Sequence, residues 1–134
     1  MKVSFLISEE IRLELNNKIT VVGLYAGDVV VIIKVERPEG MPEDTPSGLD
    51  RLTILATITE ADEGELDLKG RIINSSGEVG EEIPLGKATV RAGLSNAVVI
   101  EMKPFIVKVP GIFKFELFVN NENYLFPFEI REQA

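Results

Sequence analysis

Four polar side chains near the start of the chain are the strongest candidates for a binding site or a structural network: Glu10, Arg12, Tyr25 and Asp28. Arg12 shares a predicted strand with Glu10, and we expect that strand to pair with the segment that carries Tyr25. An arginine–carboxylate fork, made of two parallel hydrogen bonds, would order the bend predicted at Gly27. The cluster is therefore either part of the wall of the fold or a ligand site.

The residue types that most catalytic mechanisms need are missing. The 134 residues include no histidine and no cysteine, which excludes Ser–His and Cys–His nucleophiles and metal sites built on imidazole or thiolate. Paired carboxylates could hydrolyse a glycoside, but 22 acidic residues make chance pairs certain, and no tryptophan offers a sugar platform. We therefore predict that the protein is not an enzyme and has no catalytic residue, no metal site and no cofactor.

An acidic turn is the alternative place for a ligand. Carboxylates of the kind that bind calcium through oxygen cluster there, at Glu60, Asp62, Glu63, Glu65 and Asp67. The EF-hand spacing is not met, because Gly64 stands one place too early for the glycine of that loop. Calcium binding is kept only as an alternative.

The charge balance disfavours anionic partners. Fourteen basic and 22 acidic residues give a net charge of −8, which repels phosphate backbones and anionic lipid surfaces. We therefore predict no nucleic-acid and no membrane partner. The apolar run at the amino terminus is too short for a secretory signal, and the longest later run, Val29 to Ile33, is too short for a membrane helix. A cytoplasmic location is expected.

The elements that must position these residues are β-strands, and the last two are the clearest. Apolar residues alternate on both sides of a polar turn at 120–123, at Phe113, Phe115, Leu117 and Val119 and then at Phe126, Phe128 and Ile130. A period of two places each set on one face of a strand. Because a hairpin alone is marginal in water, this face must be covered by a second sheet.

The first strand carries a conflict in its pattern. Glu9 has the parity of the apolar residues on either side of it, so a bulge or break is expected around Ser8 to Glu10. The rival interpretation is a short helix capped by Ser8. Helical spacing leaves Leu13 on another face, so we favour the strand.

Further segments complete the predicted fold. The run 28–34 is apolar on both parities and is expected to be a central strand, whereas 36–50 contains three prolines and is expected to be a loop that crosses between sheets. Pro127 cannot donate to a ladder, so the last strand should lie at an edge or be bulged there. Eight or nine short strands predict an all-β fold, an antiparallel two-sheet β-sandwich of the immunoglobulin-like or jelly-roll-like type, in one domain over 1–134.

The closing hairpin, 111–130, also carries apolar residues on its outward parity: Ile112, Phe118 and Leu125. A hairpin that is apolar on both faces indicates a covering segment or a partner chain. We therefore expect a protein partner or self-association, with a homo-oligomer formed through this hairpin.

The amino-terminal run resembles a small bacterial family of β-sandwich domains of unknown function. Its members begin with an acidic-acidic-x-Arg strand, an Asn/Gly-Lys turn and a Gly-x-Tyr-x-x-Asp segment. The matching residues here are Glu9, Glu10, Arg12, Asn17, Lys18, Gly23, Tyr25, Gly27 and Asp28. The resemblance implies the fold and supplies no activity.

These patterns together predict a non-catalytic β-sandwich that acts as a protein-interaction or assembly module. The alternative is a ligand-binding module of the C2-like or carbohydrate-binding kind, for calcium or a small polar ligand. The acidic turn supports that alternative, and the missing tryptophan weakens its carbohydrate form.

Overall fold

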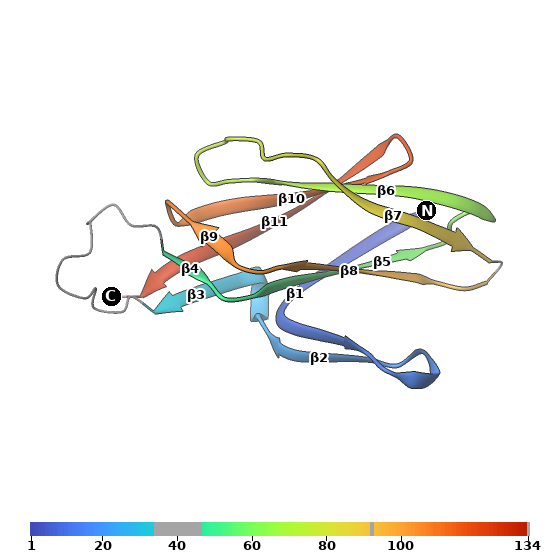
Figure 1. Ribbon diagram of the computed structural model, residues 1–134, viewed down its shortest axis with the longest axis horizontal. Helices are drawn as coiled ribbons and strands as arrows, with labels where there is room; N and C mark the ends of the chain where they lie inside the picture. Colours follow the sequence, from blue (N-terminus) through green and yellow to red (C-terminus); the bar gives the residue numbers. More distant parts are fainter. Residues whose placement is uncertain (34–46, 92, 134) are drawn as a thin grey trace.

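The computed structural model describes residues 1–33, 47–91 and 93–133, and strands make up most of that part of the chain (Figure 1). The strands are β1 Lys2–Leu13, β2 Ile19–Leu24, β3 Val29–Ile33, β4 Ser47–Leu49, β5 Leu52–Thr59, β6 Gly64–Ile73, β7 Ile83–Val90, β8 Asn96–Met102, β9 Phe105–Val107, β10 Gly111–Val119 and β11 Glu122–Gln133. Two 3-10 turns, η1 (Leu15–Asn17) and η2 (Ala26–Asp28), flank β2.

The strands form three sheets. Their orders are β2-β1-β5-β8, β3-β11-β10-β6-β7 and the short pair β4-β9. The predicted all-β class is confirmed, although the described residues hold eleven strands and not eight or nine. The strands that were not predicted include β4 and β9, which are three residues long. Three residues are too few to show an alternating pattern of apolar and polar side chains. The rest of the expected 36–50 loop, up to residue 46, lies outside the described residues.

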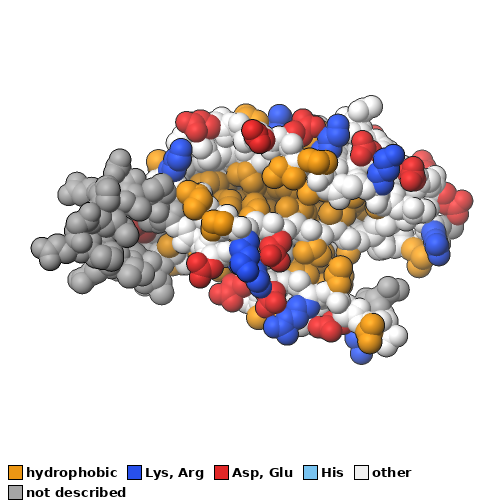
Figure 2. Space-filling model, in the orientation of Figure 1, with side chains coloured by type: hydrophobic (Ala, Val, Ile, Leu, Met, Phe, Trp, Pro, Cys, Tyr) orange, Lys and Arg blue, Asp and Glu red, His pale blue; other side chains and the backbone are white. Residues whose placement is uncertain are grey.

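Aromatic side chains join the two larger sheets in one core. Phe5 of β1 stacks on Phe126 of β11 with ring centroids 5.2 Å apart, and it meets Phe115 of β10 edge-on at 6.3 Å. Phe113 and Phe128 stack beside them at 5.9 Å. The alternating residues of the closing hairpin are all buried, as the sequence predicts. Figure 2 shows apolar side chains gathered in a band between the layers.

The position of β3 corrects one prediction. β3 is an edge strand of its sheet and pairs in parallel with β11, so the expectations of a central strand and of purely antiparallel sheets are both wrong. Val30 is buried, whereas Val31 is 47% exposed on the other face. An apolar run indicates that the side chains of a strand are buried, but it does not indicate the direction of the strand or its position in the sheet. The prediction that the last strand lies at an edge or is bulged at Pro127 is wrong for β11 as a whole, which lies between β3 and β10. Pro127 itself precedes the pairing with β3, which begins at Glu129, so its missing N–H breaks no bond of that ladder.

β1 bends in the middle and pairs with two different strands, β5 and β2. Its first part pairs with β5 as far as Ser8↔Thr53, and its second part pairs with β2 from Ser8↔Leu24 onward. In Figure 1 the second half of β1 turns back and runs with β2 as a separate projection below β5 and β8. The predicted break at Ser8 to Glu10 is therefore confirmed, and the alternative of a helix there is wrong. We call residues 9–24 the arm.

Two side chains on the outer face of β5 are buried near the arm. Thr53 and Leu55 have the outward parity of β5, opposite to the core residues Leu52 and Ile54, yet they are 0% and 5% exposed. The Thr53 hydroxyl donates to the carbonyl oxygen of Glu9 at 3.0 Å, which ties the arm to this face. Leu55 is buried outside the main core cluster. We infer that the arm shields both outward side chains.

The outer face of the closing hairpin is not wholly apolar, because a buried carboxylate and its polar partners lie among the apolar residues. Ile112 and Leu125 are about half exposed, at 53% and 50%, whereas Phe118 lies under the Arg71 guanidinium at 5.2 Å. Between them Glu116 is buried. It accepts hydrogen bonds from Arg71 Nε at 2.6 Å and Asn123 Nδ2 at 3.0 Å. The Asn123 hydrogen bond lowers the pKa of Glu116 most; burial opposes this, and the hydrogen bond and charge of Arg71 lower the pKa further.

We predict that Glu116→Gln removes a pH-dependent part of the free energy of unfolding. A carboxyl whose pKa is lowered in the folded state stabilises it above the ordinary value near 4.5, and this stabilisation is lost as the pH falls through the lowered pKa. Hydrogen bonds to charged groups contribute about 1.5–3 kcal/mol, so urea unfolding at pH 7 should show a loss of about that size. The difference from the parent protein should shrink below about pH 4.

Glu129→Gln is the matched control, because this carboxylate pairs with the exposed Arg131 on the same face. Exposed pairs contribute little, so its effect should be under about 1 kcal/mol. Equal losses in the two variants, or a Glu116→Gln loss that does not change with pH, would contradict the assignment.

Candidate functional site

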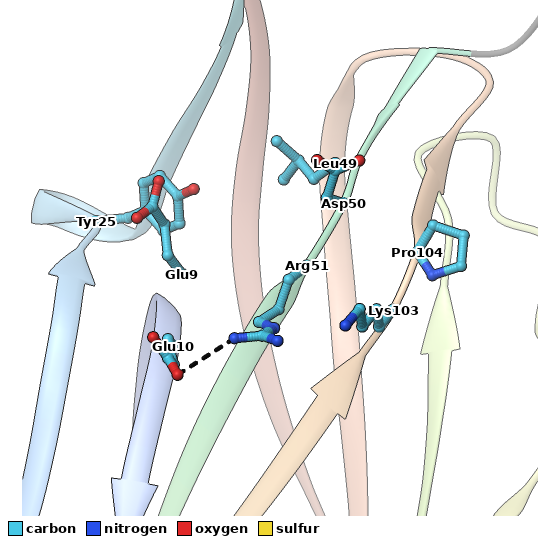
Figure 3. A pocket seen from close by; sticks show the side chains of 8 residues that line it. All are labelled: Glu9, Glu10, Tyr25, Leu49, Asp50, Arg51, Lys103 and Pro104. Atoms are coloured by element: carbon cyan, nitrogen blue, oxygen red, sulfur yellow. Dashed lines mark ion pairs between the residues drawn. The ribbon is translucent and has the colours of Figure 1, made fainter.

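The bend in β1 creates a pocket where the arm leaves the sheet. The pocket is open, has a volume of about 730 Å³ and is drawn in Figure 3. We call it the arm-root pocket; its lining residues are Glu9, Glu10, Tyr25, Leu49, Asp50, Arg51, Lys103 and Pro104. The size is in the range of pockets that hold small molecules. Charged groups of both signs on its walls make it the strongest candidate for a functional site.

Glu10 is held between two guanidinium groups. Arg12 donates from Nε to Oε1 and from Nη2 to Oε2 of Glu10, each at 3.2 Å, and Arg51 Nη1 lies 3.3 Å from Oε1. The Arg12 hydrogen bond lowers the pKa of Glu10 most; partial burial opposes this, and the charges of Arg12 and Arg51 lower the pKa further. Glu10 is therefore an ionised group whose charge is already matched by protein cations.

Arg51 and Lys103 meet because of the strand register. Leu52↔Met102 is the last pair of the β5–β8 ladder, so the two basic residues stand opposite each other just beyond it. Figure 3 shows the Lys103 amino group pointing toward the Arg51 side chain. Arg51 Nε is buried without a hydrogen-bond acceptor and lies 3.9 Å from Glu101 Oε1. In the described part of the chain, Lys103 has no ion pair, so its charge is free for a ligand, and the Asp50 carboxylate lines the same wall beside Arg51.

Glu9 and Tyr25 form the opposite wall, where Figure 3 shows the carboxylate beside the ring. A Cβ atom at Gly23 would lie 2.7 Å from Glu9 Oε2, and Gly23 has a φ of +66°, so a larger residue there would strain the backbone and displace this carboxylate. Burial raises the pKa of Tyr25, and the charge of Glu9 raises it further. Tyr25 therefore keeps its proton at neutral pH. Among the described residues, Glu9 has no ion-pair partner.

The structure brings together three of the four residues that the sequence singled out. Glu10 and Tyr25 line the pocket, and Arg12 binds Glu10 beside it. Asp28 ends η2 at a φ of +58° and does not line the pocket. Arg12 pairs with Glu10, and no hydrogen bond or ion pair joins it to Asp28 in the described part of the chain. The bend at Gly27 is a 3-10 turn in which Gly27 has a φ of +66°.

Sequence reasoning missed Glu9, Arg51 and Lys103 as site residues. Glu9 did carry a signal, because its parity conflicts with the apolar pattern around it. Arg51 and Lys103 are far apart in the chain, and only the register of β5 with β8 brings them together. A single sequence contains no signal for that register.

The described residues offer no preformed metal site at the acidic turn. No group of three or more carboxylates among them is placed to hold a metal ion, and Glu60 pairs with Lys2 at 3.5 Å. Within the same residues, no helix is long and apolar enough to cross a membrane.

Comparison with protein-family models gave no match, and comparison with curated proteins also gave none. Among solved structures, the chain is similar to part of the Pseudomonas fluorescens alkylpurine DNA glycosylase AlkC bound to DNA that contains an abasic-site analogue. The identity is 18% and the TM-score is 0.49. The match covers 79% of this chain and 28% of the glycosylase chain.

This likeness contradicts two predictions, and both are withdrawn. The first was a non-catalytic module that acts through a protein partner or self-association, and the second was the exclusion of nucleic acid. The absence of histidine and cysteine excludes only the mechanisms that need them, and a net charge of −8 is an average that does not set the charge of a local surface. At this TM-score the likeness carries no activity and no partner over to this chain.

We predict that the hydroxyl of Thr53 stabilises the bend on which the arm-root pocket depends. Thr53→Val keeps the shape of the buried side chain but removes the donor to the Glu9 carbonyl oxygen. A typical hydrogen bond contributes about 0.5–1.5 kcal/mol, so chemical denaturation should show a loss in that range. Thr57→Val is the matched control, because Thr57 lies on the same face of β5 without a hydrogen bond from its side chain in the described part. Equal effects would contradict the role of Thr53.

Proposed function

We propose that the arm-root pocket binds a small zwitterionic ligand, one that carries an ammonium group and a carboxylate, such as a free amino acid. One observation carries the proposal: Glu9 on one wall and Lys103 on the other have no ion pair in the part of the chain that the structure describes, although Asp50 adds a carboxylate beside Arg51. A ligand with both charges would satisfy both walls at once, whereas a purely anionic or cationic ligand would meet repulsion at one of them.

The carboxylate end of the ligand would lie between Arg51 and Lys103. Arg51 uses Nη1 for Glu10, and its remaining guanidinium hydrogens are not committed by a bond at 3.5 Å or less to any described residue. Glu10 and Arg12 hold this guanidinium in place, since Glu10 accepts from both arginines. Guanidinium and ammonium groups together form a strong carboxylate site because charge-assisted hydrogen bonds are about twice as strong as neutral ones.

The ammonium end of the ligand would lie against Glu9 and Tyr25. Glu9 supplies the negative charge, and the face of the Tyr25 ring attracts a cation through its quadrupole. The raised pKa of Tyr25 keeps its hydroxyl protonated, so the ring adds no charge of its own at neutral pH. The volume of the arm-root pocket, about 730 Å³, leaves room for a ligand longer than glycine.

Two broader expectations stay proposals. The amino-terminal motif supports membership of the bacterial family that it resembles, and the absence of cysteine is compatible with a reducing cytoplasm.

The experiment titrates ¹⁵N-labelled protein with glycine, β-alanine, 4-aminobutanoate and 6-aminohexanoate, which separate the two charges by increasing distances. We expect amide shifts around Tyr25, Arg51 and Lys103, with the tightest binding at one length of the series. Butylamine and butanoate carry one charge each and should bind about tenfold more weakly. That difference corresponds to about 1.4 kcal/mol for the lost charge pair.

Two variants assign the ends of the ligand. Lys103→Met should weaken the zwitterion and butanoate but not butylamine, and Glu9→Gln should weaken the zwitterion and butylamine but not butanoate. Lys108→Met is the control, since Lys108 does not line this pocket. The proposal is wrong if no member of the series shifts these amides at about 10 mM, a concentration that would detect a Kd near 1 mM.

A further inference from the structure

A second groove lies near the tip of the arm, between the arm and the outer face of the β5 sheet. Its volume is about 520 Å³, and Figure 2 shows a notch between the arm, at the lower right, and the body above it. We call it the arm groove; it is lined by Leu13, Glu14, Lys18 and Ile19 of the arm and by Thr57, Thr89, Arg91, Leu94, Ser95, Asn96 and Ala97 of the body.

The arm groove is locally positive in a chain whose net charge is −8. Lys18 on the arm and Arg91 on the body line the groove together with a single carboxylate, that of Glu14. Neither cation has an ion pair within residues 1–33, 47–91 and 93–133. Four other pockets of the described residues, the arm-root pocket among them, each carry at least as many carboxylates as basic groups. Unmatched positive charge therefore gathers in this groove.

The remaining lining groups suit a phosphate ester better than a bare anion. Thr57, Thr89 and Ser95 bring hydroxyl groups, which together with arginine and lysine are the usual protein partners of phosphate oxygens. Leu13 and Leu94 are 68% and 61% exposed on the two sides of the groove, so an apolar or flat part of a ligand would have side chains to cover.

We propose that the arm groove binds the phosphate of a nucleotide, with Lys18 and Arg91 on opposite sides of the phosphate and the nucleoside against Leu13 and Leu94. The phosphate belongs either to a free nucleotide or to a nucleic-acid strand, and the chemistry at the groove is the same. This proposal is independent of the arm-root pocket, because the two sites share no lining residue.

The test titrates ¹⁵N-labelled protein with adenosine monophosphate, with adenosine and with a 5′-phosphorylated octathymidylate. We expect adenosine monophosphate to shift the amides of Lys18 and Arg91 and to leave those of Tyr25 and Lys103 unchanged. Lys18→Gln and Arg91→Gln should each weaken binding about fivefold, the upper range for an exposed charge pair. Lys87→Gln changes the net charge equally, does not line the groove, and should have no effect.

The oligonucleotide identifies the source of the phosphate. Binding of the strand with a logarithmic salt slope near −0.7 for each phosphate contact would support a nucleic-acid strand, with the slope reduced by about 0.7 in Arg91→Gln. Binding of adenosine monophosphate alone would support a free nucleotide. The proposal is overturned if adenosine binds as well as its monophosphate, if Lys18→Gln and Arg91→Gln behave like Lys87→Gln, or if no probe shifts these amides.

Discussion

The bend of β1 at Ser8 to Glu10 is the constraint on which the rest of the structure depends. The ladder of β1 to β5 ends at Ser8↔Thr53, one residue from the start of β5 at Leu52, and a ladder to β2 begins at Ser8↔Leu24. Two hydroxyl groups stabilise the change of direction: Ser8 donates to the Glu10 carbonyl oxygen at 3.3 Å and Thr53 donates to that of Glu9. The Ser8 and Thr53 side chains are both fully buried, and buried hydroxyl groups need such partners. The arm-root pocket lies at this bend, and the arm groove lies near the far end of the same arm.

The sequence predicts the core more completely than it predicts the arrangement of strands. Alternation in the closing hairpin identifies Phe113, Phe115 and Phe128 as buried, because a period of two has one structural meaning over so many residues. The parity of Glu9 also locates the bend. The pattern of β3 is ambiguous, since an apolar run suits a central strand and an edge strand beside a neighbouring layer equally well. An apolar run looks the same in a parallel and in an antiparallel strand, so the parallel pair β3–β11 was not predicted.

The candidate site is predictable only where its members are close in the chain. Glu10 and Arg12 have the same parity on one strand, so their pairing follows from local geometry. Lys103 comes from the other end of the sheet, and its place beside Arg51 depends on the Leu52↔Met102 register. The same limit applies to charge: a total of −8 describes the whole surface, whereas the groove around Lys18 and Arg91 depends on how the arm folds back. Tertiary structure, and not composition, therefore sets the local electrostatics.

The position of the arm is tested most directly by the solvent access of Leu55. A soluble paramagnetic probe attenuates the NMR signals of exposed methyl groups, and Leu55 has the outward parity of β5 while it is only 5% exposed. If the arm covers this face, the Leu55 methyl signals will be as protected as those of the core residue Leu52, while those of the exposed Leu13 will be attenuated. Attenuation of Leu55 to the level of Leu13 would show that the arm does not lie on the sheet, and would contradict both pockets.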